Sequence, residues 1–190
     1  MSFRYITGEV VPIADRAAAA SMPQYHLLTC FGCGPENPSR LGVVPRLEGD
    51  KIVAELSFPP RFEGGPGVVH GGATAAFFDD LIGFVAMAHM LPAVTARLEI
   101  NYLQPMPIGV TIRGEASLAS RRGRKLFTEA IGTGPADRPM SRCRDCSSVS
   151  VSSTLPRPSR ALECRCSNRA STTPEPGGFG ALPFRLPSDP

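Results

Sequence analysis

Two adjacent aspartates, Asp79 and Asp80, interrupt a long apolar stretch and are the residues best suited to do chemistry. A carboxylate left buried and unpaired costs several kcal/mol, so a specific role must offset that cost. If the stretch is helical, Asp79 shares its face mainly with small residues, whereas Asp80 shares its face with bulky ones such as Phe77 and Phe84. Small side chains leave room for a substrate. This pattern favours Asp79 as the reactive acid and leaves Asp80 to pair or cap locally.

The run His70-Gly71-Gly72 lies at the start of the same stretch. At a helix start, the amides of Gly71 and Gly72 have no intrahelical acceptor and lie at the positive end of the helix dipole. Such amides stabilise negative charge developing on an oxygen, and glycine lets the backbone approach a ligand closely. The pattern predicts an oxyanion site, with His70 orienting the turn. A plain helix start, with a buried acid paired to the core, is the alternative.

The elements that position these residues can be predicted from periodicity and turn residues. Residues 72–90 contain no proline and are apolar around almost the whole circumference, which is typical of a buried helix. We expect a short helix within 13–22, a Gly- and Pro-rich loop at 59–69, and strands at 41–47, 51–58, 95–103, 110–119 and 125–131. The last two strands are joined by a basic turn, 120–124. This order predicts an α+β fold with one helix against one antiparallel sheet.

Composition limits the possible functions. The chain has 190 residues, 42% of them hydrophobic, and a formal net charge of +3, which fits a single domain. The basic residues are scattered, which gives no support to nucleic-acid binding. No signal peptide is recognisable, and no uninterrupted apolar run reaches the roughly 18 residues of a membrane span. We therefore expect a soluble cytoplasmic protein without a nucleic-acid or membrane partner.

Cysteine is frequent, with six residues in the chain. In a cytoplasmic setting we expect reduced thiols rather than disulfides. Cys30-x-x-Cys33 and Cys143-x-x-Cys146 match the spacing of a four-thiolate zinc site. The first pair lies in a Gly- and Pro-rich loop, so packing of that loop is the favoured interpretation, and we expect no metal and no cofactor. His26 and His89 are expected to be ordinary surface or core residues.

The segment Phe62-Glu63-Gly64-Gly65-Pro66-Gly67-Val68-Val69-His70-Gly71-Gly72, with an acid nine residues after the histidine, resembles hotdog-fold acyl-CoA thioesterases. The similar subgroups are the PaaI-like enzymes and the thioesterase-superfamily-member type. The resemblance continues through Thr95–Tyr102 and Gly123–Phe127 and covers residues 28–133. It implies the hotdog fold, in which an antiparallel sheet wraps one central helix. It also implies hydrolysis of an acyl-CoA to free acid and CoA.

The resemblance also implies residue roles. The catalytic set is His70, Gly71, Asp79 and Thr95: the Gly71 amide would polarise the thioester carbonyl, Asp79 would act as nucleophile or as general base for water, and Thr95 would help to hold that water. The set implied for substrate binding is Gly72, Asn101, Arg124 and Lys125, the last three towards CoA. A solvated hairpin turn is the alternative for the basic residues.

Two further implications concern assembly and the loop before the helix. Members of the family act as homodimers or homotetramers with an active site shared between subunits, so Asp79 would act on a substrate held partly by another chain's Gly71. PaaI-like members often carry Asn or Gln seven residues before the oxyanion glycine. Gly64 stands at that position here, so the relay of that subgroup is absent.

Composition changes after Asp137, where Arg, Ser, Pro and Cys become frequent. We expect an N-terminal helical extension at 1–27, a hotdog domain at 28–137, and an irregular or disordered tail at 138–190. The family's final strand, between the strands at 95–103 and 125–131, is therefore expected to be missing, which would impair stability. A shifted reading frame across codons 144–150 permits Gly-Leu-Phe-Val-Arg-Val, so a frameshift is one hypothesis for the tail.

Three functions compete. Carboxylate-assisted hydrolysis of an acyl-CoA is the leading hypothesis. A non-catalytic hotdog protein that binds acyl-CoA or an acyl carrier is the second. A hydratase on the same fold lacks support because no acid and histidine follow one another with that family's spacing.

Overall fold

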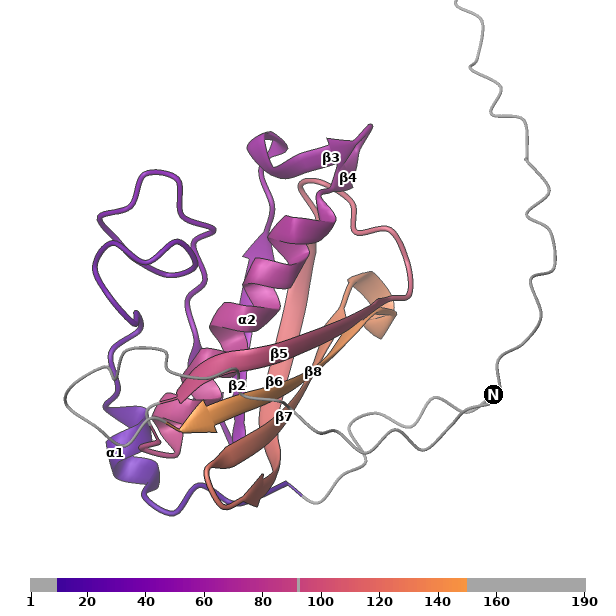
Figure 1. Cartoon of the computed structure of the whole chain (residues 1–190). Coiled ribbons are helices and arrows are strands. Elements are labelled where there is room, and N and C mark those ends of the chain that lie inside the picture. Colours follow the sequence, from indigo (N-terminus) through magenta and orange to yellow (C-terminus); the bar gives the residue numbers. More distant parts are fainter. Residues whose placement is uncertain (1–9, 92, 150–190) are drawn as a thin grey trace, which may run out of the picture. The chain divides into compact units, whose positions relative to one another are not determined.

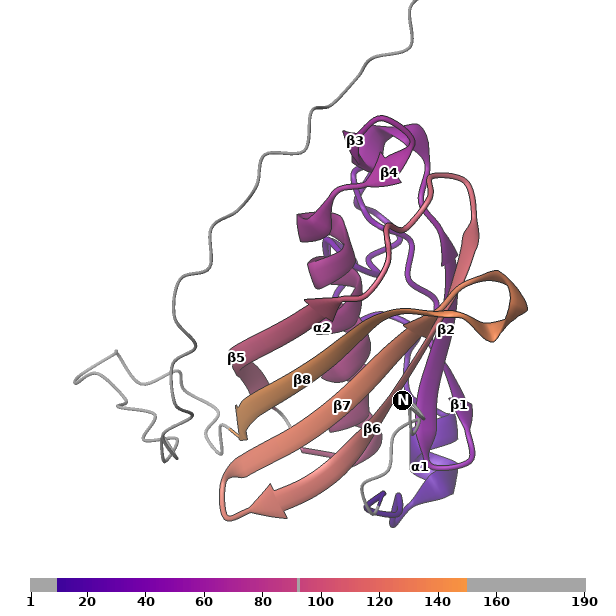
Figure 2. The same ribbon diagram turned by 90° about the vertical axis from the view of Figure 1, so that its right-hand side faces the viewer.

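One long helix, α2 (Gly71–Ala88), packs against one face of a six-stranded antiparallel sheet (Figures 1 and 2). The computed structural model describes residues 10–91 and 93–149. The strands of this sheet lie in the order β1-β2-β6-β7-β8-β5. Their bounds are β1 Arg46–Glu48, β2 Lys51–Ser57, β5 Ala93–Tyr102, β6 Thr111–Arg122, β7 Lys125–Thr133 and β8 Pro139–Val149. The predicted α+β class is confirmed.

Smaller elements flank the helix. A two-stranded ribbon, β3 (Glu63–Gly65) with β4 (Val68–Val69), lies beside the N-terminus of α2 and follows the 3-10 turn η1 (Pro60–Phe62). This ribbon occupies the predicted loop at 59–69. The short helix α1 (Arg16–Ala20) falls within the predicted segment 13–22. A second 3-10 turn, η2 (Pro135–Asp137), precedes β8.

The core lies between α2 and the sheet. Phe77 and Phe78 of the helix are fully buried, and each ring faces a glycine of the sheet. A Cβ added at Gly114 would meet the Phe77 ring at 2.6 Å, and one added at Gly132 would meet the Phe78 ring at 2.9 Å. These two glycines let the helix approach the sheet closely, and each buried phenylalanine contributes about 1.5–3 kcal/mol of apolar burial.

Two predicted element bounds were wrong. The strand expected at 41–47 is only β1, Arg46–Glu48, because Gly42 has a φ of +89° and Pro45 lacks a backbone donor. The turn expected at 120–124 is a two-residue connection between Arg122 and Lys125, with Gly123 at a φ of +58°. Glycine adopts that left-handed conformation without steric cost, so the strands extend further than their side-chain pattern suggested.

The largest correction concerns the end of the domain. The final strand, expected to be missing, is β8, and it lies between β5 and β7 with antiparallel pairing to both. The expected domain boundary at residue 137 was therefore too early. Ladder hydrogen bonds come from the backbone, so a sequence without the usual apolar alternation can still form the strand. Residues 150–190 lie outside the described part of the chain, as do residues 1–9.

Helix α2 is the one helix within residues 10–91 and 93–149 that is long and apolar enough to cross a membrane. Of its 18 residues, 61% are buried inside the domain. The core helix of a soluble protein passes the same test of length and composition, so this helix is weak support for a membrane span.

Candidate active site

The N-terminus of α2 is capped by His70. Its Nδ1 accepts a hydrogen bond from the Gly72 amide at 2.9 Å, so His70 orients the first turn as the sequence suggested. The Gly72 amide is therefore engaged, which argues against the prediction that it binds substrate through this group. Gly71, as the first helical residue, has no intrahelical acceptor. Its exposed amide is thus the donor of this turn that remains for a ligand.

The side chain of Tyr102 was not among the predicted site residues. Its hydroxyl donates a hydrogen bond to the Gly71 carbonyl at 2.9 Å, which links the end of β5 to the start of α2. An open hollow of about 390 Å³ begins beside these two residues. Its lining is mainly apolar and includes Val68, Met106 and Met140. No periodicity in the sequence marks this contact, because it joins residues 31 positions apart.

Asp79 and Asp80 have opposite environments. Asp79 is exposed on the face of α2 that carries small residues, and Thr95 Oγ1 of β5 donates a hydrogen bond to its Oδ1 at 2.8 Å. Asp80 is only 8% exposed. The direct contact between Asp79 and Thr95 was not predicted. Asp80 is paired as expected, but with His26 and Cys30, which lie 54 and 50 residues away rather than nearby on the helix. The carboxylate that needs a buried partner is Asp80 alone.

Gly71 and Asp79 do not meet within one chain. They are eight residues apart on one helix, which places them about 12 Å apart along its axis. A single reacting carbonyl must lie about 3 Å from both the oxyanion donor and the attacking group. The described chain therefore presents the two halves of a site rather than one complete site.

The residues predicted to bind CoA lie elsewhere. Asn101 is exposed on β5, next to Tyr102, and alternation along the strand directs the two side chains to opposite faces of the sheet. Arg124 lies in the β6–β7 turn, and Lys125 begins β7. That turn is at the far end of the sheet from the β3–β4 ribbon beside Gly71 (Figure 2). Within one chain, Arg124 and Lys125 are therefore not brought to the helix N-terminus, whereas Asn101 is next to Tyr102, whose hydroxyl contacts Gly71.

The structure leaves no room for a side chain at Gly64, the position of the relay residue in PaaI-like members. A Cβ added at Gly64 would lie 2.7 Å from the Cα of His70. Any side chain at this position would force the β3–β4 ribbon away from the helix cap. The loop is therefore built around the glycine, in agreement with the predicted departure from the PaaI-like pattern.

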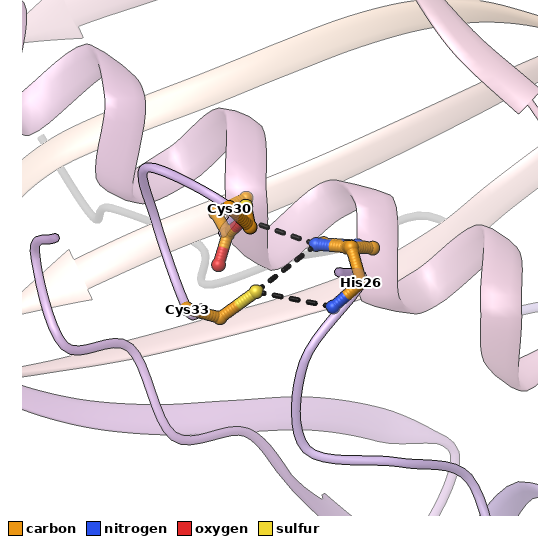
Figure 3. A group of neighbouring side chains, drawn as sticks. His26, Cys30 and Cys33 are labelled. Atoms are coloured by element: carbon orange, nitrogen blue, oxygen red, sulfur yellow. Dashed lines mark hydrogen bonds and ion pairs between the residues drawn. The ribbon is translucent and has the colours of Figure 1, made fainter. Parts of the chain in front are cut away.

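A second group of reactive side chains surrounds Asp80. His26 Nδ1 lies 3.0 Å from Asp80 Oδ1, Cys30 Sγ donates to the same oxygen at 3.4 Å, and Cys33 Sγ lies 3.4 Å from His26 Nδ1 (Figure 3). Burial raises the pKa of the Cys33 thiol to about 12, so in the metal-free chain this thiol is protonated at neutral pH.

His26 was expected to be an ordinary surface or core residue, and the structure places its ring in contact with Asp80, Cys33 and Phe84. The spacing His26-x-x-x-Cys30-x-x-Cys33 was available as a signal. It was missed because the CxxC pair was compared with Cys143 and Cys146, which lie on β8 with their backbones paired to β5 and β7.

Comparison with known proteins agrees with this geometry. Residues 66–133 match the model of the thioesterase superfamily. The chain is 35% identical over 69 residues to acyl-coenzyme A thioesterase THEM4 of Xenopus laevis, which is 36% of this chain and 31% of that protein. It is 40% identical over 67 residues to THEM4 of Mus musculus, which is 35% of this chain and 29% of that protein. The chain thus spans about a third of the length of these curated relatives.

Solved structures show the same fold. A thioesterase superfamily protein aligns with a TM-score of 0.61 and 24% identity over 64% of this chain and 60% of its own. The PaaI protein of the E. coli phenylacetic acid degradation operon aligns with a TM-score of 0.55 and 17% identity over 58% of this chain and 80% of its own. The protein smu.793 of Streptococcus mutans, solved bound to acetyl CoA, aligns with a TM-score of 0.53 and 18% identity over 57% of this chain and 86% of its own. Residues 66–133 are therefore similar to the thioesterase superfamily, and the described chain has the fold of these solved structures.

Proposed function

We propose that this protein hydrolyses acyl-CoA thioesters. The observation that carries the proposal is the exposed Asp79 carboxylate, held by the Thr95 hydroxyl at 2.8 Å on a helix whose first amide, that of Gly71, is open to a ligand. The matched segments of the THEM4 thioesterases and the acetyl CoA bound to the similar Streptococcus mutans protein support the substrate class. The apolar hollow beside Gly71 is a candidate site for the acyl group.

The chemistry follows from these groups. With Asp79 as general base, its carboxylate takes a proton from water, and the resulting hydroxide attacks the thioester carbon. With Asp79 as nucleophile, an acyl-aspartyl anhydride forms and water then cleaves it. In both cases the carbonyl oxygen becomes an oxyanion that the Gly71 amide stabilises, and CoA leaves as its thiolate. Both roles of Asp79 are open.

We further propose that the complete site forms between two copies of this chain. The separation of about 12 Å between Gly71 and Asp79 requires a second chain to supply one of the two groups. Strand β5 is at the edge of the sheet, and it carries Thr95. On or next to it, Val94 is 61% exposed, Tyr102 55% and Leu103 41%, which is unusual for an edge that stays uncovered. A homodimer or homotetramer that covers β5 would bring Asp79 of one chain to Gly71 of another.

Replacement of Asp79 tests the function. Asp79→Asn keeps an oxygen to accept from Thr95 but removes the charge, so we expect turnover of acyl-CoA to fall by about 10²–10⁴ while the fold is retained. Release of free CoA thiol from short, long and aromatic acyl-CoAs measures turnover. Glu36→Gln makes the same chemical change at an exposed position outside the proposed catalytic and binding residues and should keep wild-type turnover.

Full turnover in Asp79→Asn would overturn the assignment. A wild-type protein that acyl-CoA stabilises against heat without any release of thiol would instead be a binding protein on the same fold.

A further inference from the structure

A partly buried cluster of four potential metal ligands includes Asp80 and lies beside α2; Cys33 and Asp80 are its buried members. His26, Cys30, Cys33 and Asp80 each offer one ligand atom, and these atoms all lie within 4.8 Å of one another. The three side chains from the loop point towards one another beside α2 (Figure 3). Among the described residues this is the one such group of histidine, cysteine and acidic side chains.

Three of the separations are close to those of ligands around one tetrahedral ion. Zinc bonds of about 2.0 Å to nitrogen or oxygen and about 2.3 Å to sulfur place neighbouring ligand atoms about 3.3–3.8 Å apart. The observed separations are 3.0 Å from His26 Nδ1 to Asp80 Oδ1, 3.4 Å from Cys30 Sγ to the same oxygen, and 3.4 Å from Cys33 Sγ to His26 Nδ1. Small adjustments of side chains would suffice to surround an ion.

An independent observation concerns the second carboxylate oxygen of Asp80, Oδ2. Its side chain is only 7% exposed, and its Oδ2 has no hydrogen-bond partner among the described residues. A buried carboxylate oxygen without a partner is costly, and a cation removes that cost. The hydrogen bonds to Oδ1 leave this second oxygen unexplained.

Two glycines shape the space around the cluster. A Cβ added at Gly32 would lie 2.2 Å from the Asp80 carboxyl carbon, and one added at Gly83 would lie 2.7 Å from His26 Nε2. Both contacts are far shorter than a real Cβ allows, so the loop and the helix approach one another only because these positions are glycine. On its other face the His26 ring stacks on Phe84, with centroids 4.0 Å apart. The ring is thus held with Nδ1 towards the cluster.

We propose that His26, Cys30, Cys33 and Asp80 bind one Zn²⁺ ion. Two sulfur ligands with one imidazole and one carboxylate are a donor set that suits zinc better than Mg²⁺ or Ca²⁺, which prefer oxygen. Four protein ligands leave no open position, so the ion is structural rather than catalytic. Binding displaces the thiol protons and ties the loop 26–33 to the middle of α2.

Metal content of the full-length, tag-free protein tests this proposal, independently of thioesterase activity. After expression with added zinc and purification under reducing conditions, we expect one zinc ion per chain by elemental analysis. Co²⁺ exchanged into the site should give the visible spectrum of a tetrahedral ion together with a thiolate charge-transfer band. His26→Gln and Cys30→Ser should each weaken zinc binding at least about tenfold, because each removes a direct ligand.

Control variants separate this site from its neighbours. Asp79→Asn changes the adjacent carboxylate and should keep the zinc, whereas Asp80→Asn should weaken zinc binding as His26→Gln does. The double variant Cys143→Ser/Cys146→Ser should also keep it. Circular dichroism of each variant shows whether the fold is retained when the metal is lost. Cys30 is half-buried, so we expect Cys30→Ser to disturb the fold less than a substitution at a buried position.

Three results would overturn the proposal. The first is wild-type protein that contains no zinc and gives no tetrahedral Co²⁺ spectrum. The second is a Cys30–Cys33 disulfide in protein that was kept reduced during purification, and the third is equal loss of zinc in the Cys143→Ser/Cys146→Ser and Cys30→Ser variants.

Discussion

At the scale of single residues, neighbouring positions on one helix have opposite roles. A step of one residue turns the direction of the side chain by about 100°, so Asp79 faces the solvent and Thr95 while Asp80 faces the loop that carries Cys30 and Cys33. Asp79 is exposed, and no buried partner is required for its charge. Asp80 is buried and depends on His26 and the thiols.

The role of the Gly71 amide can be tested with proline, which has no amide hydrogen. Gly71 is the first residue of α2, a position where proline is tolerated, and His70 already has φ −58° and ψ +132°, a conformation that a following proline allows. We expect Gly71→Pro to keep the fold and to lower kcat about 10²–10³-fold, the usual cost of one oxyanion donor. Steady-state hydrolysis of an acyl-CoA measures kcat.

Gly71→Ala is the matched control for that substitution. It keeps the amide hydrogen, and its added Cβ would lie 3.5 Å from the Tyr102 hydroxyl, an ordinary contact. Its kcat should remain within a few-fold of wild type. Equal losses in Gly71→Ala and Gly71→Pro would mean that space beside Tyr102, rather than the amide, is what the site requires.

At the scale of elements, strand β8 determines whether the sheet is complete. It pairs with β7 on one side and with β5 on the other, so it connects the strand carrying Thr95 to the remainder of the sheet. Without β8, strand β5 would have no partner in the order β1-β2-β6-β7-β8-β5. Helix α2 would then retain Asp79, but Thr95 would lose the ladder that places it.

A proline within β8 tests this arrangement. Arg144 pairs with Glu99 of β5 and Glu129 of β7, so it is flanked by strands on both sides. Arg144→Pro removes a ladder donor in an interior strand, and we expect it to lower the free energy of unfolding by about 1–3 kcal/mol or more. Urea unfolding followed by circular dichroism measures the change.

Arg144→Thr is the control for the same position, since threonine keeps the amide and favours strands. It should change the free energy of unfolding much less than Arg144→Pro. Equal stability of the two variants would mean that residues 139–149 do not form an interior strand, in which case the sequence-based prediction of an aberrant tail would regain support. Sequencing the gene around codons 132–143 tests the frameshift hypothesis directly.

At the scale of the whole molecule, the separation of Gly71 and Asp79 would make the proposed activity a property of a pair of chains. Each chain of such a pair would supply Asp79 to one site and Gly71 to the other. This proposal accounts for the exposed apolar residues on and beside β5, including Val94 and Leu103, which would be covered by the partner. The cytoplasmic location and the acyl-chain preference stay predictions.

Complementation between two inactive chains tests the shared site. If Asp79→Asn and Gly71→Pro chains are unfolded together and refolded, half of the randomly formed dimers carry one intact site, so about a quarter of wild-type activity should return. The thiol-release assay measures this recovery, and light scattering confirms the dimer. Mixed chains that remain as inactive as either variant alone would place both groups in one chain's own site.

The sequence by itself determined most of the elements that carry the candidate active site. Helix 72–90, the strands at 51–58, 95–103 and 125–131, and the glycine-started helix with Asp79 follow from local periodicity and helix-start chemistry, which depend on neighbouring residues only. The strand at 139–149 was missed because its pairing depends on backbone groups, which side-chain patterns do not report.

Only the tertiary structure decided which residues distant in the sequence are in contact. It brought His26, Cys30, Cys33 and Asp80 together across 54 residues of chain, and Tyr102 to Gly71 across 31. It also left Arg124 and Lys125 away from the helix N-terminus. Contacts of this kind follow from the path of the chain through the fold, so local spacing cannot supply them.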